Sequence, residues 1–454
     1  MTVWGLSATQ IAAVAIFLAT YVAVAIGRMP GLRVDRAGAA LIGAGLMVAC
    51  GVLSLEQAYR AIDLDTITLL LGMMIVVANL RLSGFFRMVT GWAAGRAHHP
   101  ALLLVAVVVT TGLLSAVLVN DAICLVMTPI VITLTRALGR NPVPYLIAVA
   151  LSSNVGSTAT ITGNPQNMII GNLSGMSYGA FAAALAPVAA AGLLVTILVL
   201  LVLNPREFLT RRRLPRVTVP SHYHGWLAAK SALVSVAMIG LFFTGQPVAK
   251  VAICAAALLL LTRRIEPKKV YAEIDGQLLL MFAGLFVVVA GLEHAVLTKD
   301  VLARAAHVDL GNVALLTGVT AVLSNLVSNV PAVLVLKPFV EQLQDPTHAW
   351  LVVAMASTLA GNFTLLGSVA NLIVAERAAK DGVRIDFWTY FRVGAPLTAV
   401  TMAIGVLVLG AGCRRVSSEF RLRQDISCFN RTLEAVVSIT DWVFWKILDL
   451  RNRR

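Results

Sequence analysis

The chain has 454 residues, of which 59% are hydrophobic and only 13% are charged, and its mean hydropathy is +0.86. This composition is typical of a helical protein that crosses the membrane many times, and it leaves no room for a soluble domain. We attribute the net charge of +14 to basic cytoplasmic loops that face anionic lipid, so we expect no nucleic-acid partner.

Apolar segments long enough to cross a bilayer recur from Thr9 to Ala411. The uninterrupted segments are 9–27, 37–53, 64–80, 178–203, 226–244, 248–262, 275–292 and 391–411. Polar residues, Gly or Pro interrupt the others, which are 101–138, 144–173, 311–343 and 349–375. The first segment follows no positive charge and precedes no small-residue cleavage site, so we expect a retained span rather than a signal peptide.

The positions of Lys and Arg predict the orientation. The loop after the first segment carries three arginines, Arg28, Arg33 and Arg36. We therefore place this loop in the cytoplasm and the N-terminus outside. Segment 101–138 begins and ends beside basic residues, so we expect a re-entrant hairpin with Asn120 and Asp121 at its tip. The basic linker 204–225 is also expected in the cytoplasm.

The chain repeats itself. At one offset, seven residues of the first hairpin (Thr111, Ser115, Asn120, Leu125, Val126, Pro129, Val131) match seven of the second (Thr320, Ser324, Asn329, Leu334, Val335, Pro338, Val340). Two more matched sets are Asp63 and Gly72 with Asp275 and Gly284, and Thr160, Gly163 and Asn167 with Thr364, Gly367 and Asn371. Each half holds five spans and a hairpin, an odd number, so the two halves must be inverted.

We therefore predict an all-α polytopic membrane protein with two inverted repeats, each of five spans plus a re-entrant hairpin, and two unwound helices. The expected regions are 1–203 for the first repeat, 204–225 for the cytoplasmic linker, 226–413 for the second repeat and 414–454 for a basic tail. Inverted repeats with interrupted helices are the signature of a secondary transporter whose site lies near the midplane. The span count places the tail outside, where it forms either an amphipathic interfacial helix or a poorly ordered appendage.

Asn120 and Asn329 occupy the two hairpin tips and are the first candidates for binding residues. An Asn carbonyl is a ligand for a hard cation, its amide donates to an anion, and helix N-termini behind each tip favour an anion. The alternative is that both residues only tie helices together. Asp121 is the one carboxylate well inside an apolar stretch of the first half, which favours a coupling-ion site over a structural hydrogen bond. Its counterpart is Val330.

The unwound helices supply the remaining candidate ligands for substrate or ion. These are Asn154, Thr158, Thr160, Thr162, Gly163, Asn164 and Asn167, then Ser328 at the second tip, and Asn362, Thr364, Gly367, Ser368 and Asn371. Lys337 either contacts an anion or extends its amine to the membrane interface. Cys124 is best explained as a small apolar residue. No Walker A, HExxH, GxSxG or CxxC sequence is present, so we expect no enzyme, no metal site and no cofactor other than sodium or proton as coupling ion.

Four stretches carry a family resemblance: VNDAICLVMTPIV, STATITGNPQNMIIG, SNVPAVLVLKPFV and GNFTLLGSVANLIVAERA. They resemble the duplicated motifs of the ion transporter superfamily, over roughly residues 10–412. In its dicarboxylate branch each tip reads Ser-Asn-Thr, whereas this chain has Val119-Asn120-Asp121 and Ser328-Asn329-Val330. The sequence is more similar to the arsenite/antimonite permease and citrate-transporter-like branches.

The resemblance implies a scaffold region, a transport region that holds both hairpins, and a homodimer with elevator-like motion. We expect a multi-pass protein of a bacterial-type inner membrane that moves a small anion along an ion gradient, with arsenite or antimonite efflux as the first hypothesis. A dicarboxylate or citrate symporter, a sodium/proton antiporter and a membrane scaffold or sensor without flux are the alternatives.

Overall fold

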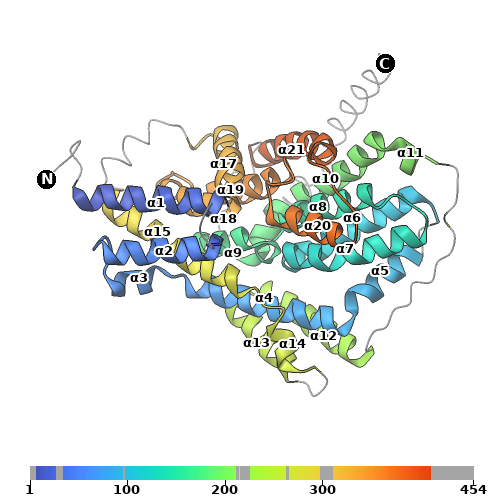
Figure 1. Cartoon of the computed structure of the whole chain (residues 1–454), viewed down its shortest axis with the longest axis horizontal. Coiled ribbons are helices and arrows are strands. Elements are labelled where there is room, and N and C mark those ends of the chain that lie inside the picture. Colours follow the sequence, from blue (N-terminus) through green and yellow to red (C-terminus); the bar gives the residue numbers. More distant parts are fainter. Residues whose placement is uncertain are drawn as a thin grey trace, which may run out of the picture.

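The computed structural model describes residues 7–26, 34–95, 98–210, 214, 225–261, 265–296 and 310–410. Within these ranges the chain forms twenty α-helices and one 3-10 helix, and no β-strand (Figure 1). The first half contains α1 (Ala8–Ile26), α2 (Arg36–Ala49), α3 (Leu55–Ala61), α4 (Leu64–Ser83), α5 (Phe85–Gly95), α6 (Pro100–Val117), α7 (Asn120–Ala137), α8 (Pro142–Ser157), η1 (Ile161–Gly163), α9 (Pro165–Ser174), α10 (Tyr178–Leu203) and α11 (Pro205–Phe208). The second half contains α12 (Gly225–Phe242), α13 (Val248–Leu260), α14 (Pro267–Tyr271), α15 (Gly276–Val296), α17 (Val313–Val327), α18 (Asn329–Val340), α19 (Pro346–Ala360), α20 (Val369–Lys380) and α21 (Phe387–Gly410).

The main contacts between helices occur twice, once for each half. Helices α2 and α13 occupy corresponding positions in the two halves, and so do α4 and α15. Helix α2 packs along α15, and α13 packs along α4 in the same way. Similarly, α6 packs on α8 and α17 on α19, while α10 and α21 pack on each other. Figure 1 shows α1, α2 and α15 side by side at one end of the molecule. The helix contacts of one half are thus repeated in the other, which confirms the duplication and the predicted all-α membrane fold; the inversion of the two repeats stays a prediction.

Two glycines show how closely this repetition is kept. A Cβ atom on Gly72 would lie 2.8 Å from the carbonyl carbon of Ala252, and a Cβ atom on Gly284 would lie 2.7 Å from that of Ala40. The four residues match at the same offset between the halves. Small residues allow membrane helices to approach until their backbones touch. The duplicated Gly residues therefore set the spacing of α4 with α13 and of α15 with α2.

Substitution of Gly284 by alanine should destabilise the protein, although alanine is intrinsically the better helix former. The added methyl group would overlap the Ala40 backbone, and overpacking of this kind costs about 1–3 kcal/mol. Gly45 in α2 is the matched control because nothing lies within 4 Å of its Cβ position. Thermal unfolding of the purified variants should show a lower midpoint for Gly284→Ala only; equal midpoints would contradict the close helix crossing.

Both hairpins and both unwound helices are present. Only Leu118 and Val119 separate α6 from α7, and only Ser328 separates α17 from α18. Helix α8 ends at Ser157 and α9 begins at Pro165, while α19 ends at Ala360 and α20 begins at Val369. In a bilayer, irregular backbone of this kind requires protein or a cavity around it. The first break is buried throughout and meets that requirement. In the second break Asn362 and Ser368 are buried, whereas Phe363 and Leu366 are exposed.

The outer surface fits a lipid environment. Eight of the described helices are long and apolar enough to cross a membrane. Large apolar side chains on α1 and α12 face outward, among them Val22 at 56% and Leu233 at 71% exposure. Trp226 and Trp388 are exposed at the starts of α12 and α21, as expected for aromatic residues at a membrane interface. The chain is a multi-pass membrane protein.

The structure contains short elements that the apolar segments did not predict. Helix α5 packs on α4, α6 and α7 and follows the end of α4 directly, between the expected segments 64–80 and 101–138. With 11 residues it is too short to cross a bilayer. Helix α11 forms the first part of the linker 204–225. The tail 414–454 lies outside the described residues.

Candidate functional site

Asn154 connects the two repeats. Its carbonyl oxygen Oδ1 accepts hydrogen bonds from Asn120 Nδ2 (3.1 Å) and Ser368 Oγ (3.2 Å). Its amide nitrogen Nδ2 donates to Asn362 Oδ1 (2.9 Å) and Asn371 Oδ1 (3.1 Å). All five side chains are buried. Because the whole amide of Asn154 is used, the first hairpin tip is held at a fixed position against the second unwound helix.

The same pattern of hydrogen bonds from an Asn side chain to the backbone stabilises both unwound segments. Asn167 Nδ2 donates to the backbone oxygens of Ser157 (3.1 Å) and Thr160 (3.0 Å). Its counterpart Asn371 donates to those of Gly361 (2.7 Å) and Thr364 (3.1 Å). Carbonyl groups at the end of a helix have no partner within the helix. The duplicated Asn residues therefore stabilise each helix end where the backbone unwinds.

A narrow cavity of about 40 Å³ lies between the hairpin tips and the helices α1, α2 and α15. Besides α2, which begins at Arg36, four helices begin at its wall: α7 at Asn120, α9 at Pro165, α18 at Asn329 and α20 at Val369. Helix N-termini carry partial positive charge and unpaired N–H groups. Their convergence on one cavity favours an anion or the oxygen atoms of a polar solute.

Two opposite charges line the same cavity. Arg36 contributes a guanidinium group from the start of α2, and Asp121 contributes a carboxylate from the first turn of α7. Neither side chain forms an ion pair within the described part of the chain. The buried oxygen Oδ1 of Asn120 accepts no hydrogen bond from any described residue. The cavity wall therefore carries one arginine, one aspartate and several neutral polar side chains.

The second hairpin tip has an unusual backbone. Ser328 has φ 78° and ψ 160°, a region that is populated essentially by glycine and costs a serine about 1–3 kcal/mol. Its neighbour Asn329 accepts a hydrogen bond from Ser324 Oγ at 2.6 Å. Ser324 also donates to the backbone oxygen of Ser357, which fixes the tip against α19. Strain of this kind concentrates at functional sites.

The structure brings part of the predicted set to the cavity and places the rest behind it. The residues at the cavity wall are Asn120, Asp121, Ser328, Asn329 and Ser368. The supporting network contains Asn154, Thr158, Asn164, Asn167, Asn362 and Asn371, with Thr364 accepting through its backbone. Thr160 and Thr162 bond to the last turn of α6. Gly163 and Gly367 lie inside the two unwound turns.

Lys337 lies near the C-terminal end of α18, outside the residues that line the cavity. Its amine Nζ is 3.3 Å from Glu293 at the end of α15. This ion pair joins the second hairpin to α15. Contact of Lys337 with an anion stays a prediction. Cys124 is buried and donates to Ser153 Oγ at 3.1 Å, as expected for a residue used in packing.

Two polar or charged residues at the cavity wall, Arg36 and Gln166, were not among those predicted from the sequence. Arg36 was assigned only to the basic loop that orients the first span. Gln166 lies within the GNPQN motif and donates to Thr358 Oγ1 at 3.2 Å, yet the prediction favoured Asn, Ser and Thr. The position of Gln166 in the first turn after the break was a usable signal. No pattern in the sequence indicated that Arg36 faces the hairpin tips.

Two repeats, two hairpins that meet at a polar cavity and two unwound helices define a membrane transporter. Comparison with known proteins agrees: the model of the citrate transporter family, CitMHS, matches residues 21–360. The chain belongs to this family, within the ion transporter superfamily.

Relatives and a solved structure extend the comparison. The chain is 30% identical to the silicon efflux transporter LSI3 of Oryza sativa subsp. japonica over 84% of this chain and 94% of the relative. It is 25% identical to the transporter arsB of Dictyostelium discoideum, over 83% and 88%. The crystal structure of the YdaH transporter of Alcanivorax borkumensis superposes with a TM-score of 0.56 at 14% identity, covering 89% of this chain and 98% of that one. The structural likeness concerns the fold.

Proposed function

We propose that this protein is a secondary transporter that exports a small oxyanion of the arsenite class, or its conjugate acid, across a bacterial-type inner membrane, driven by an ion gradient. The observation that carries the proposal is the cavity at which four helix N-termini, Arg36 and Asp121 meet. Its volume of about 40 Å³ favours a compact solute over an extended tricarboxylate such as citrate. The names of the relatives, a silicon exporter and arsB, support the same class.

Arsenite suits this mixture of groups because it is largely uncharged arsenous acid at neutral pH. Its oxygen atoms accept hydrogen bonds from helix N-termini and Arg36, and its hydroxyl groups donate to Asp121 and to Asn120 Oδ1. A proton on Asp121 would remove one of these acceptors. Substrate and proton would then compete for the site, and competition between two ligands is the requirement for antiport. An inward proton gradient would thereby drive export.

Sodium at Asp121 is the alternative coupling ion, since carboxylate and amide oxygens are ligands for hard cations. The N-terminus outside, the linker 204–225 in the cytoplasm and a homodimer belong to the same proposal. Contacts between helix ends agree with this topology: Asn172 donates to Asp63 at 2.8 Å, and Arg140 pairs with Glu207 at 2.8 Å. The two residues of each pair lie at helix ends that the positions of Lys and Arg assign to the same side of the membrane.

Replacing Asn120 by alanine should abolish transport while the protein stays folded. The change removes the unpaired acceptor Oδ1 of Asn120 and one hydrogen bond to Asn154, and a buried polar atom left without its partner costs about 1–3 kcal/mol. Charge movement in proteoliposomes would be recorded with arsenite, phosphate, sulfate, citrate and succinate, each with and without a proton or sodium gradient.

The matched control is Asn172→Ala, whose side chain is exposed and bonds only to Asp63; it should transport normally. Full transport by Asn120→Ala would disprove the hairpin-tip site. Currents that follow proton or sodium jumps but ignore every anion would instead indicate a sodium/proton antiporter. Size-exclusion profiles of both variants would establish that any loss of transport is not a loss of folding.

A further inference from the structure

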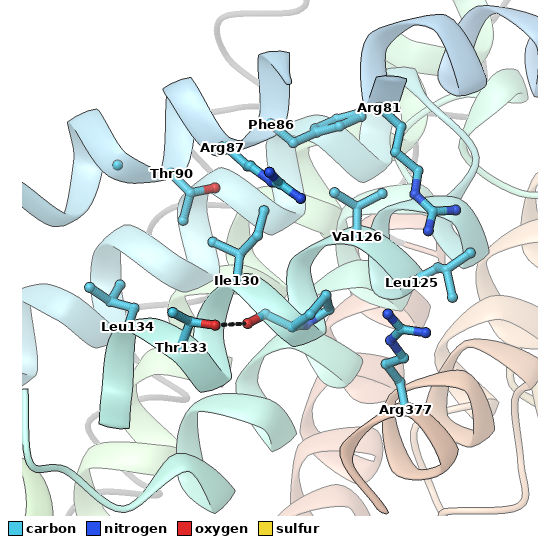
Figure 2. A pocket seen from close by; sticks show the side chains of 12 residues that line it. Arg81, Phe86, Arg87, Thr90, Leu125, Val126, Ile130, Thr133, Leu134 and Arg377 are labelled. Carbon is cyan, nitrogen blue, oxygen red and sulfur yellow. Dashed lines mark hydrogen bonds between the residues drawn. The ribbon is translucent and has the colours of Figure 1, made fainter. Parts of the chain in front are cut away.

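A larger pocket of about 340 Å³ lies on the side of α7, away from the hairpin tip. It is bounded by the end of α4, by α5, by residues 125–134 of α7 and by α20. Three arginines line it, Arg81, Arg87 and Arg377, and none of the other lining residues is acidic. Figure 2 shows the three guanidinium groups extending toward the same space from different helices. We call it the arginine pocket.

The positive charge of the arginine pocket is only partly compensated. Arg81 forms an ion pair with Glu273. Arg87 and Arg377 form no ion pair within the described part of the chain. Arg87 is exposed, whereas the Nε atom of Arg377 is buried without a hydrogen-bond partner. A buried guanidinium nitrogen without an acceptor costs free energy that a bound anion would recover.

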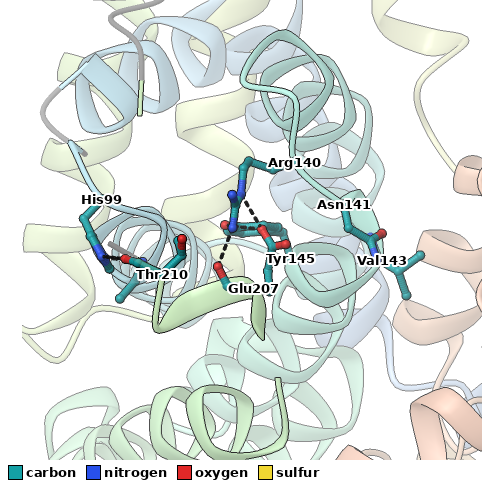
Figure 3. Close-up of polar contacts among 8 residues, drawn as sticks. His99, Arg140, Asn141, Val143, Tyr145, Glu207 and Thr210 are labelled. Atoms are coloured by element: carbon teal, nitrogen blue, oxygen red, sulfur yellow. Dashed lines mark hydrogen bonds and ion pairs between the residues drawn. The ribbon is translucent and has the colours of Figure 1, made fainter. Parts of the chain in front are cut away.

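Arg140 shows what a compensated arginine looks like in the same protein. Its Nε atom is 2.8 Å from Glu207 Oε1, its terminal nitrogen donates to the backbone oxygen of Glu207, and Tyr145 bonds to the same carboxylate (Figure 3). The charge of Arg140 therefore has a carboxylate partner from the chain itself. The arginine pocket offers Arg87 and Arg377 no such carboxylate.

The remaining wall of the arginine pocket is apolar. Phe86, Leu125, Val126 and Ile130 face the same space. Apolar walls reduce the screening of charge by water and strengthen the attraction between an arginine and an anion. Arginine also presents a planar fork that binds two oxygens of one phosphate or carboxylate group. A volume of about 340 Å³ lies in the range of small-molecule sites.

We propose that the arginine pocket is a second anion site, separate from the hairpin-tip cavity, that binds a phosphate group through Arg87 and Arg377. The phosphate group would belong either to a free anion or to the headgroup of an anionic phospholipid, since both present the same oxygens. A bound phosphate would bridge α5 of the first repeat and α20 of the second. This inference does not rest on the proposed export of arsenite.

The test is binding by the purified full-length protein in uncharged detergent, read as the thermal unfolding midpoint at fixed ionic strength. One series titrates inorganic phosphate against chloride. The other compares short-chain phosphatidylglycerol with phosphatidylcholine of the same chain length, which lacks net charge. Phosphate or phosphatidylglycerol should raise the midpoint, and phosphatidylcholine should not. If inorganic phosphate raises the midpoint, a free anion is sufficient to occupy the site. If only phosphatidylglycerol raises it, the ligand is a lipid headgroup.

Arg87→Gln and Arg377→Gln should each weaken binding by about tenfold, the effect of removing one charge-assisted hydrogen bond. Arg384→Gln is the matched control, because Arg384 lies shortly after α20 and is not among the residues that line the pocket; it should bind as the unchanged protein does. Asn120→Ala should also retain binding. The proposal is overturned if no anion raises the midpoint, if Arg87→Gln and Arg377→Gln bind normally, or if Asn120→Ala abolishes the response.

Discussion

Asn154→Ala is expected to lower the stability of the folded protein by about 3–5 kcal/mol and to abolish transport. The substitution deletes four hydrogen bonds and leaves the polar atoms of Asn120, Asn362 and Ser368 without those partners in a buried region. An orphaned buried polar group costs about 1–3 kcal/mol. The loss is larger than for Asn120→Ala, which removes only one bond of this network.

The measurement is the thermal unfolding midpoint of each purified variant, with Asn172→Ala as the control for the same chemical change at an exposed position. The control should stay close to the unchanged protein, because an exposed hydrogen bond exchanges with water at little cost. If Asn154→Ala unfolds at the same temperature as Asn172→Ala, Asn154 does not join the two repeats. Equal midpoints for Asn154→Ala and Asn120→Ala would mean that its bonds to the second repeat contribute nothing.

Asp121→Asn is expected to uncouple transport from the ion gradient. The substitution keeps the size of the side chain and removes the one carboxylate that lines the cavity. Without it the affinity for arsenite should no longer depend on proton concentration. In the unchanged protein, a coupling free energy of about 1–3 kcal/mol would change this affinity roughly 5- to 150-fold. Exchange of substrate across the membrane without a gradient should continue, since the helix N-termini and Arg36 remain.

Two flux assays in proteoliposomes separate these effects: accumulation of arsenite against a gradient, and exchange of arsenite at equal concentrations. Asp65→Asn is the control, because Asp65 also lies in the first turn of a helix but is exposed. It should leave both fluxes unchanged. Accumulation by Asp121→Asn at the normal level would exclude Asp121 as the coupling site, and loss of both fluxes would show that substrate binding itself requires the carboxylate, contrary to the expected exchange.

The repeat and its polar breaks could be predicted from the sequence because they are local patterns in the chain. Asn120 and Asn329 each precede a proline by nine residues within an apolar run, and the structure places both at hairpin tips. The breaks after Ser157 and Ala360 followed from Gly, Ser and Thr in segments that otherwise span the bilayer. Helix α5 was missed because its 11 residues do not form a long apolar run.

The sequence by itself determined the fold class, the duplication and the positions where helices break, since hydrophobic length and repeated motifs are properties of neighbouring residues. Tertiary structure decided which of those residues share a site. Asn154 meets Asn362 and Asn371 across more than 200 residues of chain, and Arg36 reaches the hairpin-tip cavity from the start of α2. The arginine pocket arises in the same way, from α4, α5 and α20. Such contacts depend on how helices cross in three dimensions, and no local pattern in the chain records that geometry.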